Sequence, residues 1–218
     1  LPVGVEINSL INDLRAFSWE ASEIFLYCSQ ILKDSNNKSN ILLNDNIDDP
    51  VTLADLKVNT IIIQRINEKY KDIDWEILSE ENIKIDFDNF NCNSDWVWVL
   101  DPLDGTKDFI QGTSNYAMHL GLNYKKKPYL GVVLIPEKGE LWISNGRETW
   151  VEKSDGKPIK TILEGEKNLK EMIITTSKNH RNEKLQNIIE KVGFKKVKIM
   201  GSIGCKIASI LRLSLIHI

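Results

Sequence analysis

Between residues 75 and 152 the sequence is divided into short apolar runs separated by turns, and this division limits the fold more than any other feature. The runs have the length of strands and are rich in β-branched and aromatic residues, while Asn145-Gly146 is typical of a hairpin turn. They predict a largely antiparallel sheet with strands at Trp75 to Leu78, Trp96 to Leu100, Tyr116 to Asn123, Tyr129 to Ile135, Leu141 to Ser144 and Thr149 to Glu152. The run from Trp96 to Leu100 predicts a strand that is covered on both faces.

Two amphipathic helices are predicted before this sheet. Apolar residues recur at helical spacing from Ile7 to Leu32, which indicates one long helix that packs against the core. A second helix is expected from Thr52 to about Tyr70, with its inward residues at Leu53, Leu56, Ile62 and Ile66.

The rhythm of the sequence changes after a polar connection from Pro158 to Leu169. Strand and helix patterns then alternate at Met172 to Thr176, Glu183 to Val192, Lys195 to Met200 and Ile203 to Leu213. Such alternation indicates an α/β layer. We therefore expect a mixed α/β (α+β) protein with two domains, residues 1–160 and residues 161–218.

Composition excludes some classes of function. The chain has 218 residues, of which 42% are hydrophobic, so it can bury a sizeable core. Its net charge of -3 argues against a nucleic-acid-binding surface, although a local basic subsite could still bind the phosphates of a nucleotide. No stretch has the length of a membrane span, and the widely spaced Cys28, Cys92 and Cys205 indicate neither a disulfide framework nor a zinc site. A cytoplasmic location is expected.

Asp101 and Asp104 follow the predicted strand that ends at Leu100, where the core gives way to solvent. Pro102 is expected to stop sheet pairing at this point. The next residues, Gly105 and Thr106, allow a close backbone approach and a helix start, whose free N–H groups favour phosphate oxygens. Carboxylates and phosphate repel each other unless a cation lies between them, and Mg²⁺ commonly bridges the two.

Acids also occur at two earlier positions, where each has an ordinary structural explanation. Glu80 and Glu81 follow a predicted strand, but adjacent glutamates usually form a solvated surface. Asp55 lies at the start of the second helix, where Thr52 and Asp55 fit a variant of the capping box. The Asp-Gly pair at 104 and 105 is also a common turn. Only the three groups together favour a metal centre.

These groups, in this order, resemble the inositol monophosphatase superfamily of Mg²⁺-dependent, lithium-sensitive phosphatases. The matching segments are Pro50-Val51-Thr52 with Asp55, Ser79-Glu80-Glu81, and Asp101 to Thr106. The continuation Lys107-Asp108-Phe109-Ile110 looks most similar to the CysQ-like 3'(2'),5'-bisphosphate nucleotidase branch. Two later segments, Thr176 to Arg181 and Gly201 to Lys206, resemble the second domain of the family.

The resemblance implies a layered α-β-α-β-α sandwich of the sugar-phosphatase type, with an antiparallel first sheet and an incomplete second domain. It also implies that Glu80, Asp101 and the carbonyl of Leu103 bind one Mg²⁺, that Asp101 and Asp104 share a second, and that two or three ions take part. Glu81 is a less certain ligand. In the family, the acid that matches Asp55 and the hydroxyl that matches Thr106 orient and deprotonate the attacking water.

The same resemblance implies substrate contacts, which have alternatives. The candidates are Gly105, Thr106, Lys107, Ser202 and Lys206, with Ser177 and His180 in weaker positions. Ser202 is equally a good helix N-cap, and Lys107 could be an ordinary surface lysine. His119 and His217 are interpreted as structural or incidental.

One departure from the family limits these expectations. The remaining carboxylate of the second metal normally lies in a Trp-Asp segment beyond residue 218, so we expect a C-terminally truncated chain with little turnover, in which residues 211–218 are not native. The predicted activity is removal of the 3'-phosphate of 3'-phosphoadenosine 5'-phosphate, a small phosphorylated nucleotide, in sulfate assimilation. The alternatives are an inositol-phosphate phosphatase and a catalytically inactive cation-binding fragment.

Overall fold

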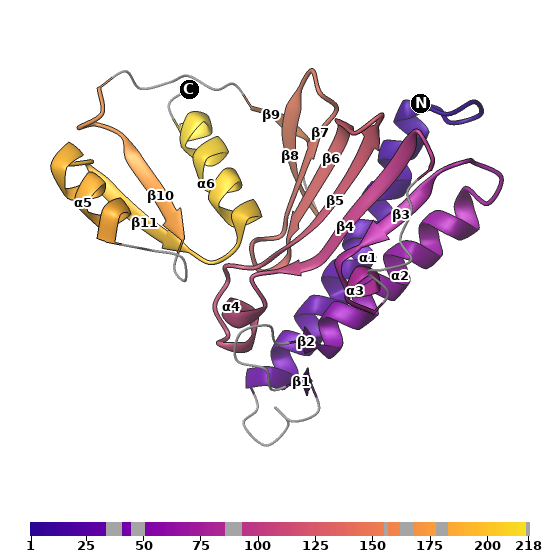
Figure 1. Cartoon of the computed structure of the whole chain (residues 1–218), viewed down its shortest axis with the longest axis horizontal. Helices are drawn as coiled ribbons and strands as arrows, with labels where there is room; N and C mark the ends of the chain where they lie inside the picture. The colour runs from indigo at the N-terminus through magenta and orange to yellow at the C-terminus, as the bar shows by residue number, and fades with distance from the viewer. Residues whose placement is uncertain are drawn as a thin grey trace.

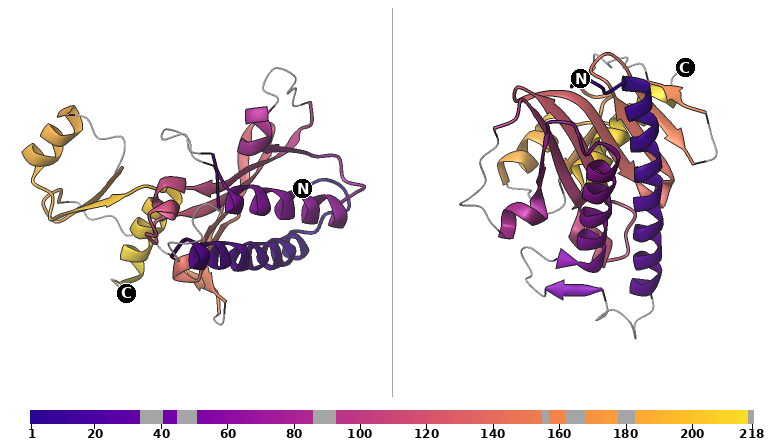
Figure 2. Two further views of the ribbon diagram at one scale, coloured as in Figure 1. Left: turned by 90° about the horizontal axis from the view of Figure 1, so that it is seen from below. Right: turned by 90° about the vertical axis from the view of Figure 1, so that its right-hand side faces the viewer.

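The computed structural model describes residues 1–33, 41–44, 51–85, 93–154, 157–161, 168–177 and 183–216. Two long helices lie on one side of the molecule, α1 (Ile7–Lys33) and α2 (Leu53–Lys69), and Figure 2 shows them side by side. The short strands β1 (Leu42–Asn44) and β2 (Val51–Thr52) pair just before α2. Both predicted helices are confirmed.

The buried stripe of α2 differs from the predicted one. Ala54, Val58, Ile62 and Ile66, spaced by four residues, are fully buried. Leu56 was predicted to point inward but is exposed, because it lies half a turn away from this stripe. Leu53 is only partly buried at the edge of the core.

The main sheet has seven strands in sequence order, β3 (Glu76–Ser79), β4 (Trp96–Asp104), β5 (Ala117–Tyr124), β6 (Lys127–Ile135), β7 (Glu140–Ser144), β8 (Thr149–Lys153) and β9 (Ile159–Lys160). Strands β3 and β4 are parallel, and every later pair is antiparallel. The largely antiparallel sheet is thus confirmed. Short helical segments lie in three of the connections between its strands: α3 (Glu80–Ile85), α4 (Thr106–Ile110) and the 3-10 turn Pro136–Lys138.

The second part of the described chain contains β10 (Ile173–Ser177), α5 (Glu183–Val192), β11 (Lys196–Met200) and α6 (Ile203–Ile216). Strands β10 and β11 form a parallel pair, as expected of an alternating α/β layer. Helix α6 contacts this pair and also β5 and β6 of the main sheet. The division into domains at residue 160 remains a prediction.

The elements form layers in the order helix, sheet, helix, sheet, helix. Figure 1 shows α1 and α2 against one face of the main sheet, α6 on its other face, then β10 and β11, and finally α5. The face toward α1 and α2 holds the larger core, which includes Trp98, Leu100 and Leu120. The face toward α6 holds a smaller cluster around Trp142, Cys205 and Ala208.

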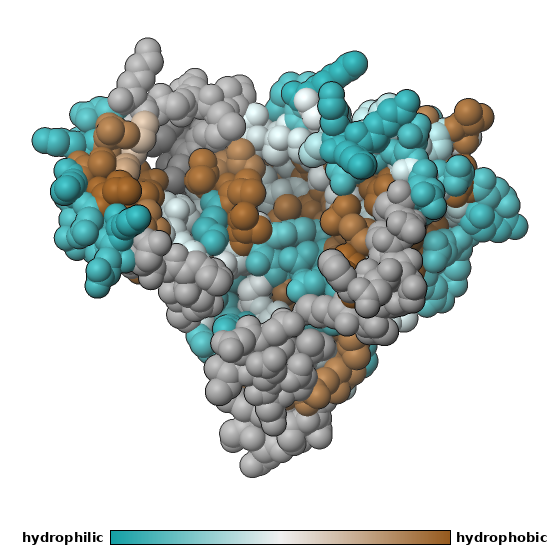
Figure 3. Space-filling model, viewed as in Figure 1, coloured by the Kyte–Doolittle hydropathy of each residue, from teal (hydrophilic) through white to brown (hydrophobic). Residues whose placement is uncertain are grey.

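The second face of the main sheet is only partly covered. Val99 on β4 is 38% exposed, so the prediction that this strand is covered on both faces is wrong at that position. The physical reason is that α6 packs mainly on β5 and β6 and hydrogen-bonds to β4 at Asp104, the last residue of that strand. Apolar side chains are also exposed on α6 itself, at Ile203, Ile207 and Ile210, where Figure 3 shows a hydrophobic surface.

Pro102 does not end its strand, contrary to the prediction, because β4 runs on to Asp104. The pairing with β5 contains a bulge, since Asp101 pairs with His119 and Asp104 pairs with Ala117. The bulge inserts one extra residue on β4 and leaves its neighbours unpaired. A proline lacks the N–H that a regular ladder would need, so the bulge is where it can be accommodated.

Candidate functional site

The bulge in β4 determines which way its two aspartates point. In a regular strand, residues three apart lie on opposite faces, and one of these carboxylates would enter the core. Because the bulge adds one residue, Asp101 and Asp104 instead lie on the same face as their partners His119 and Ala117. The intervening Leu103 points into the core, where it is 3% exposed.

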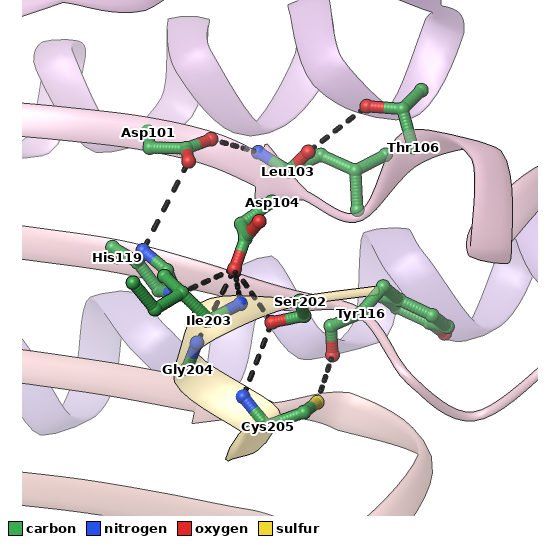
Figure 4. Close-up of polar contacts among 10 residues, drawn as sticks. All are labelled: Asp101, Leu103, Asp104, Thr106, Tyr116, His119, Ser202, Ile203, Gly204 and Cys205. Carbon is green, nitrogen blue, oxygen red and sulfur yellow. Dashed lines mark hydrogen bonds and ion pairs between the residues drawn. The ribbon is translucent and has the colours of Figure 1, made fainter. Parts of the chain in front are cut away.

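His119 lies between the two aspartates, as Figure 4 shows. Its Nε2 atom is 3.2 Å from Oδ2 of Asp104, and its Nδ1 atom is 3.9 Å from Oδ2 of Asp101. The sequence analysis interpreted His119 as structural or incidental and therefore missed this position. The only signal that could have revealed it is the strand register, which a single sequence does not display.

Asp104 also holds the start of α6. Its Oδ2 atom accepts hydrogen bonds from the hydroxyl of Ser202 at 2.6 Å and from the backbone N–H groups of Ile203 at 2.5 Å and Gly204 at 3.3 Å (Figure 4). Burial alone would raise the pKa of Asp104, but His119 and these hydrogen bonds lower it. Ser202 is indeed the N-cap of α6, since its hydroxyl accepts from the N–H of Cys205 at 3.1 Å.

Asp101 lies among like charges. Burial, with Glu80 and Asp104 nearby, raises the pKa of Asp101 to about 7, although the positive potential of His119 opposes the rise. Glu80 is the first residue of α3, directly after β3, and β3 is the parallel neighbour of β4. The ends of these two strands therefore bring Glu80 and Asp101 together, as the sequence led us to expect.

Asp55 forms a complete capping box with Thr52. Its Oδ2 atom accepts from the Thr52 hydroxyl at 2.5 Å and from the Thr52 N–H at 2.7 Å, while the Thr52 hydroxyl accepts from the N–H of Ala54 at 3.2 Å. Burial, together with the charge of Glu81, raises the pKa of Asp55 to about 7 despite these hydrogen bonds. The structural explanation for Asp55 is thus correct, and the perturbed pKa additionally suits a group that exchanges protons near neutral pH.

The segment after Asp104 is a tight turn into α4. Gly105 is the N-cap, with a φ of 93°, and a side chain there would come within 2.8 Å of the carbonyl of Asn115. Thr106 is the first residue of α4, and its hydroxyl donates to the carbonyl of Leu103 at 3.0 Å. Thr106 therefore opens the helix as expected, while the close approach depends on glycine at position 105.

The remaining candidates are less closely tied to the acids. Lys107 lies on α4 and Lys206 on α6, both partly buried. The structure brings these helices together, since a Cβ atom on Gly201, just before α6, would overlap with the carboxylate of Asp108 on α4. Ser177 ends β10, whereas Pro50, His180, His217 and Cys92 lie outside the described residues.

The oxygen atoms of Glu80, Asp101, Asp104 and the Leu103 carbonyl are the kind of ligand that a hard divalent cation prefers. The negative charge of the buried Asp101 is also unfavourable unless a cation offsets it. As the side chains stand, no group of three Asp, Glu, His or Cys residues within the described ranges lies in a geometry that could hold a metal ion. In Figure 4, Oδ2 of Asp104 faces His119 and the start of α6, and Oδ1 of Asp101 accepts from the N–H of Leu103.

Asp101 borders a hollow on the partly covered face of the sheet. This cavity of about 490 Å³ is lined by residues of β4, β5, β6 and β7, among them Asp101, His119, Asn123 and Tyr129.

In the described part of the chain, no helix is both long and apolar enough to span a bilayer. Cys28 and Cys205 are buried free thiols.

The sequence matches a model of the inositol monophosphatase family over residues 12–215. Among curated proteins, the 3'(2'),5'-bisphosphate nucleotidase CysQ of Salmonella typhimurium is 27% identical over 157 residues. The match includes 71% of this chain and 60% of that enzyme, so the chain spans less than two thirds of the length of this relative.

Solved structures show the same fold at lower sequence identity. The extragenic suppressor protein suhB from Bartonella henselae superposes with a TM-score of 0.70 at 18% identity, over 93% of this chain and 74% of that one. SaIMPase-II, solved with 2'AMP bound, superposes with a TM-score of 0.63 at 23% identity, over 92% and 68% of the two chains. These similarities confirm the layered fold.

Proposed function

Because the chain belongs to the inositol monophosphatase family, we propose that it carries the hydrolytic centre of a Mg²⁺-dependent phosphomonoesterase. The observation that supports this most directly is the placement of Asp101 and Asp104 on one face by the bulge, beside Glu80 from the neighbouring strand end. Three acids clustered in this way need positive charge to offset their repulsion.

In this proposal the cations are held by oxygen ligands. Glu80, Asp101 and the carbonyl of Leu103 hold one Mg²⁺, Asp101 and Asp104 hold a second, and a third ion is compatible with the same acids. Mg²⁺ bound there would lower the pKa of a water molecule and offset the charge on the phosphate. The carbonyl oxygen of Leu103 already accepts a hydrogen bond from the hydroxyl of Thr106. Its second lone pair remains for a cation.

Asp55 and Thr106 orient the attacking water and take its proton. Asp55 suits this role because its pKa of about 7 lets it accept a proton near neutral pH. The hydroxyl of Thr106 is held by the carbonyl of Leu103, so its oxygen can accept a hydrogen bond from the water while its own hydrogen is engaged.

The substrate phosphate is bound by the turn after Asp104 and by the start of α6. Gly105 allows the close backbone approach, and Thr106 and Lys107 follow it on α4. Ser202 is the N-cap of α6, and Lys206 lies in the first turn of this helix. These residues bind and orient an anion without forming a covalent bond to it.

We propose that the substrate is 3'-phosphoadenosine 5'-phosphate, which would place the enzyme in sulfate assimilation in the cytoplasm. The support is the similarity to CysQ and the segment Lys107-Asp108-Phe109-Ile110. An inositol phosphate is the second candidate, because the family model bears that name and the proposed metal centre would act on either leaving alcohol.

The substrate assignment is tested by phosphate release from both compounds, measured with the full-length natural protein. We expect release from 3'-phosphoadenosine 5'-phosphate to require Mg²⁺ and to exceed release from inositol 1-phosphate. The reverse preference would move the protein to the inositol branch. Release that persists in EDTA would overturn the cation-dependent mechanism.

Asp101→Asn tests the centre itself. The substitution removes a ligand shared by both cations, so we expect phosphate release to fall by at least about 100-fold and Mg²⁺ affinity, measured by calorimetry, to fall by at least about 10-fold. The exposed Asp72→Asn is a matched control that should leave both unchanged. Near-normal turnover in Asp101→Asn would defeat the proposal.

A further inference from the structure

We propose that His119 is a positioning residue, which holds the carboxylate of Asp104 in place through its Nε2 atom. The proposal rests on the proposed function for its consequence, since Asp104 is one of the acids assigned to the cations. Nothing in the sequence pattern assigned a role to His119, and its position follows from the register of β4 and β5.

The distances identify the nitrogen that acts. Nε2 lies 3.2 Å from Oδ2 of Asp104, a close ion-pair contact although the N–H is not aligned for a regular hydrogen bond, whereas Nδ1 is 3.9 Å from Asp101. A carboxylate beside Nε2 favours the tautomer that carries its hydrogen on that atom. His119 thus acts on Asp104 directly and on Asp101 only through the electric field.

The imidazole ring has little freedom to leave this position. It is 22% exposed, and the backbone of α6 passes so close that a Cβ atom on Gly204 would overlap with Nε2 of His119 and contact Val133. The ring is therefore enclosed between its own strand, Asp104 and the first turn of α6. A side chain whose rotamer is restricted in this way can fix the direction of its partner.

His119 shares Asp104 with the start of α6. The Oδ2 atom that faces Nε2 accepts hydrogen bonds from Ser202, Ile203 and Gly204. Groups that hydrogen-bond a ligating carboxylate from outside set its orientation, and their loss typically weakens metal binding by about 10 to 100-fold. His119 occupies that outer position here.

Two amide substitutions separate this role from packing. The amide nitrogen of glutamine can reach the position of Nε2, whereas that of asparagine reaches only the position of Nδ1. We expect His119→Gln to keep Mg²⁺ and Mn²⁺ affinity within about 3-fold, and His119→Asn and His119→Leu to lose about 10-fold, as measured by calorimetry on folded protein. Asn123→Leu, on the same strand and the same face, is the matched control and should change neither affinity.

A second readout needs no metal. Ile203 and Gly204 donate their N–H groups to Asp104, so a loosened carboxylate exposes them to exchange. In EDTA we expect these two amides to exchange at least about 5-fold faster in His119→Leu and His119→Asn than in the wild type or His119→Gln. The Asn123→Leu control should match the wild type.

The outcomes distinguish this proposal from the proposed function. Equal behaviour of His119→Gln and His119→Leu in both readouts would overturn positioning by Nε2, as would unchanged behaviour in all three His119 variants. If the wild type binds neither cation, the proposed centre fails, and the amide exchange alone then decides for or against His119.

Discussion

Only a hydrogen atom fits at the α-carbon of Gly204, because the first turn of α6 lies directly against His119 and Val133 on the main sheet. We predict that Gly204→Ala displaces α6 and lowers the free energy of unfolding by about 1 to 3 kcal/mol. Urea denaturation measures this change. Gly131→Ala is the control, since Gly131 lies on the same face with open space at its α-carbon. A Gly204→Ala variant as stable as this control would show that α6 can shift without loss.

At the scale of an element, α2 depends on its capping box. Thr52→Ala removes the hydroxyl that accepts from Ala54 and donates to Asp55, so we predict a loss of about 1 to 2 kcal/mol in the free energy of unfolding. Thr52→Ser keeps the hydroxyl and should lose less than half as much. Thermal or urea unfolding of the three proteins provides the comparison, and equal losses in both variants would assign the effect to the methyl group of Thr52.

Elements with a strong local signal could be predicted from the sequence. The spacing of apolar residues indicated α1, the Asn145-Gly146 hairpin lies between β7 and β8, and Glu183–Val192 is a helix with the predicted bounds. Thr52 with Asp55 was recognised as a capping box, and Ser202 as a possible N-cap, because both motifs are decided within a few residues.

Features that depend on register could not be predicted. The bulge between Asp101 and Asp104 exists only in relation to β5, and the position of His119 follows from the same pairing. Local rules therefore ended the strand at Pro102 and treated His119 as incidental. Similarly, Leu56 is apolar at a plausible helical position, but the neighbouring stripe of α2 was buried instead.

At the scale of the whole molecule, one ion pair ties the helical layer to the sheet. Arg15 on α1 contacts Glu152 on β8, with Nη2 2.6 Å from Oε1. Burial alone would raise the pKa of Glu152, but the hydrogen bonds from Arg15 and Trp150 lower it. Glu152 is only 4% exposed, so the contact is buried between the two layers. It lies far from the acids, because β8 is four strands away from β4 in the sheet.

The stability of the metal-free protein should depend on pH through Asp55, and Asp101, whose pKa is also raised to about 7, should add to the same dependence. The pKa of Asp55 is raised from 3.8 to about 7, so the folded state keeps a proton that the unfolded chain loses. That contribution is complete below the unfolded pKa and is lost as the pH rises through about 7. From Asp55 alone we predict a fall on the order of 2 kcal/mol in the free energy of unfolding between about pH 5 and pH 8 in EDTA. Asp55→Asn should remove this part of the dependence and leave the part that Asp101 contributes, and an unchanged slope would locate its origin elsewhere.

The bulge in β4 makes the site depend on chain length at this point as well as on side-chain identity. Asp101 and Asp104 share a face only because three steps along β4 match two along β5. One inserted residue would turn Asp104 toward the buried side, among neighbours such as Met118 and Leu134. A deletion would restore a regular ladder with both acids still on one face, but without the extra peptide between them. Insertions and deletions here change the chemistry of the site, whereas many apolar replacements of Leu103 would leave its backbone in place.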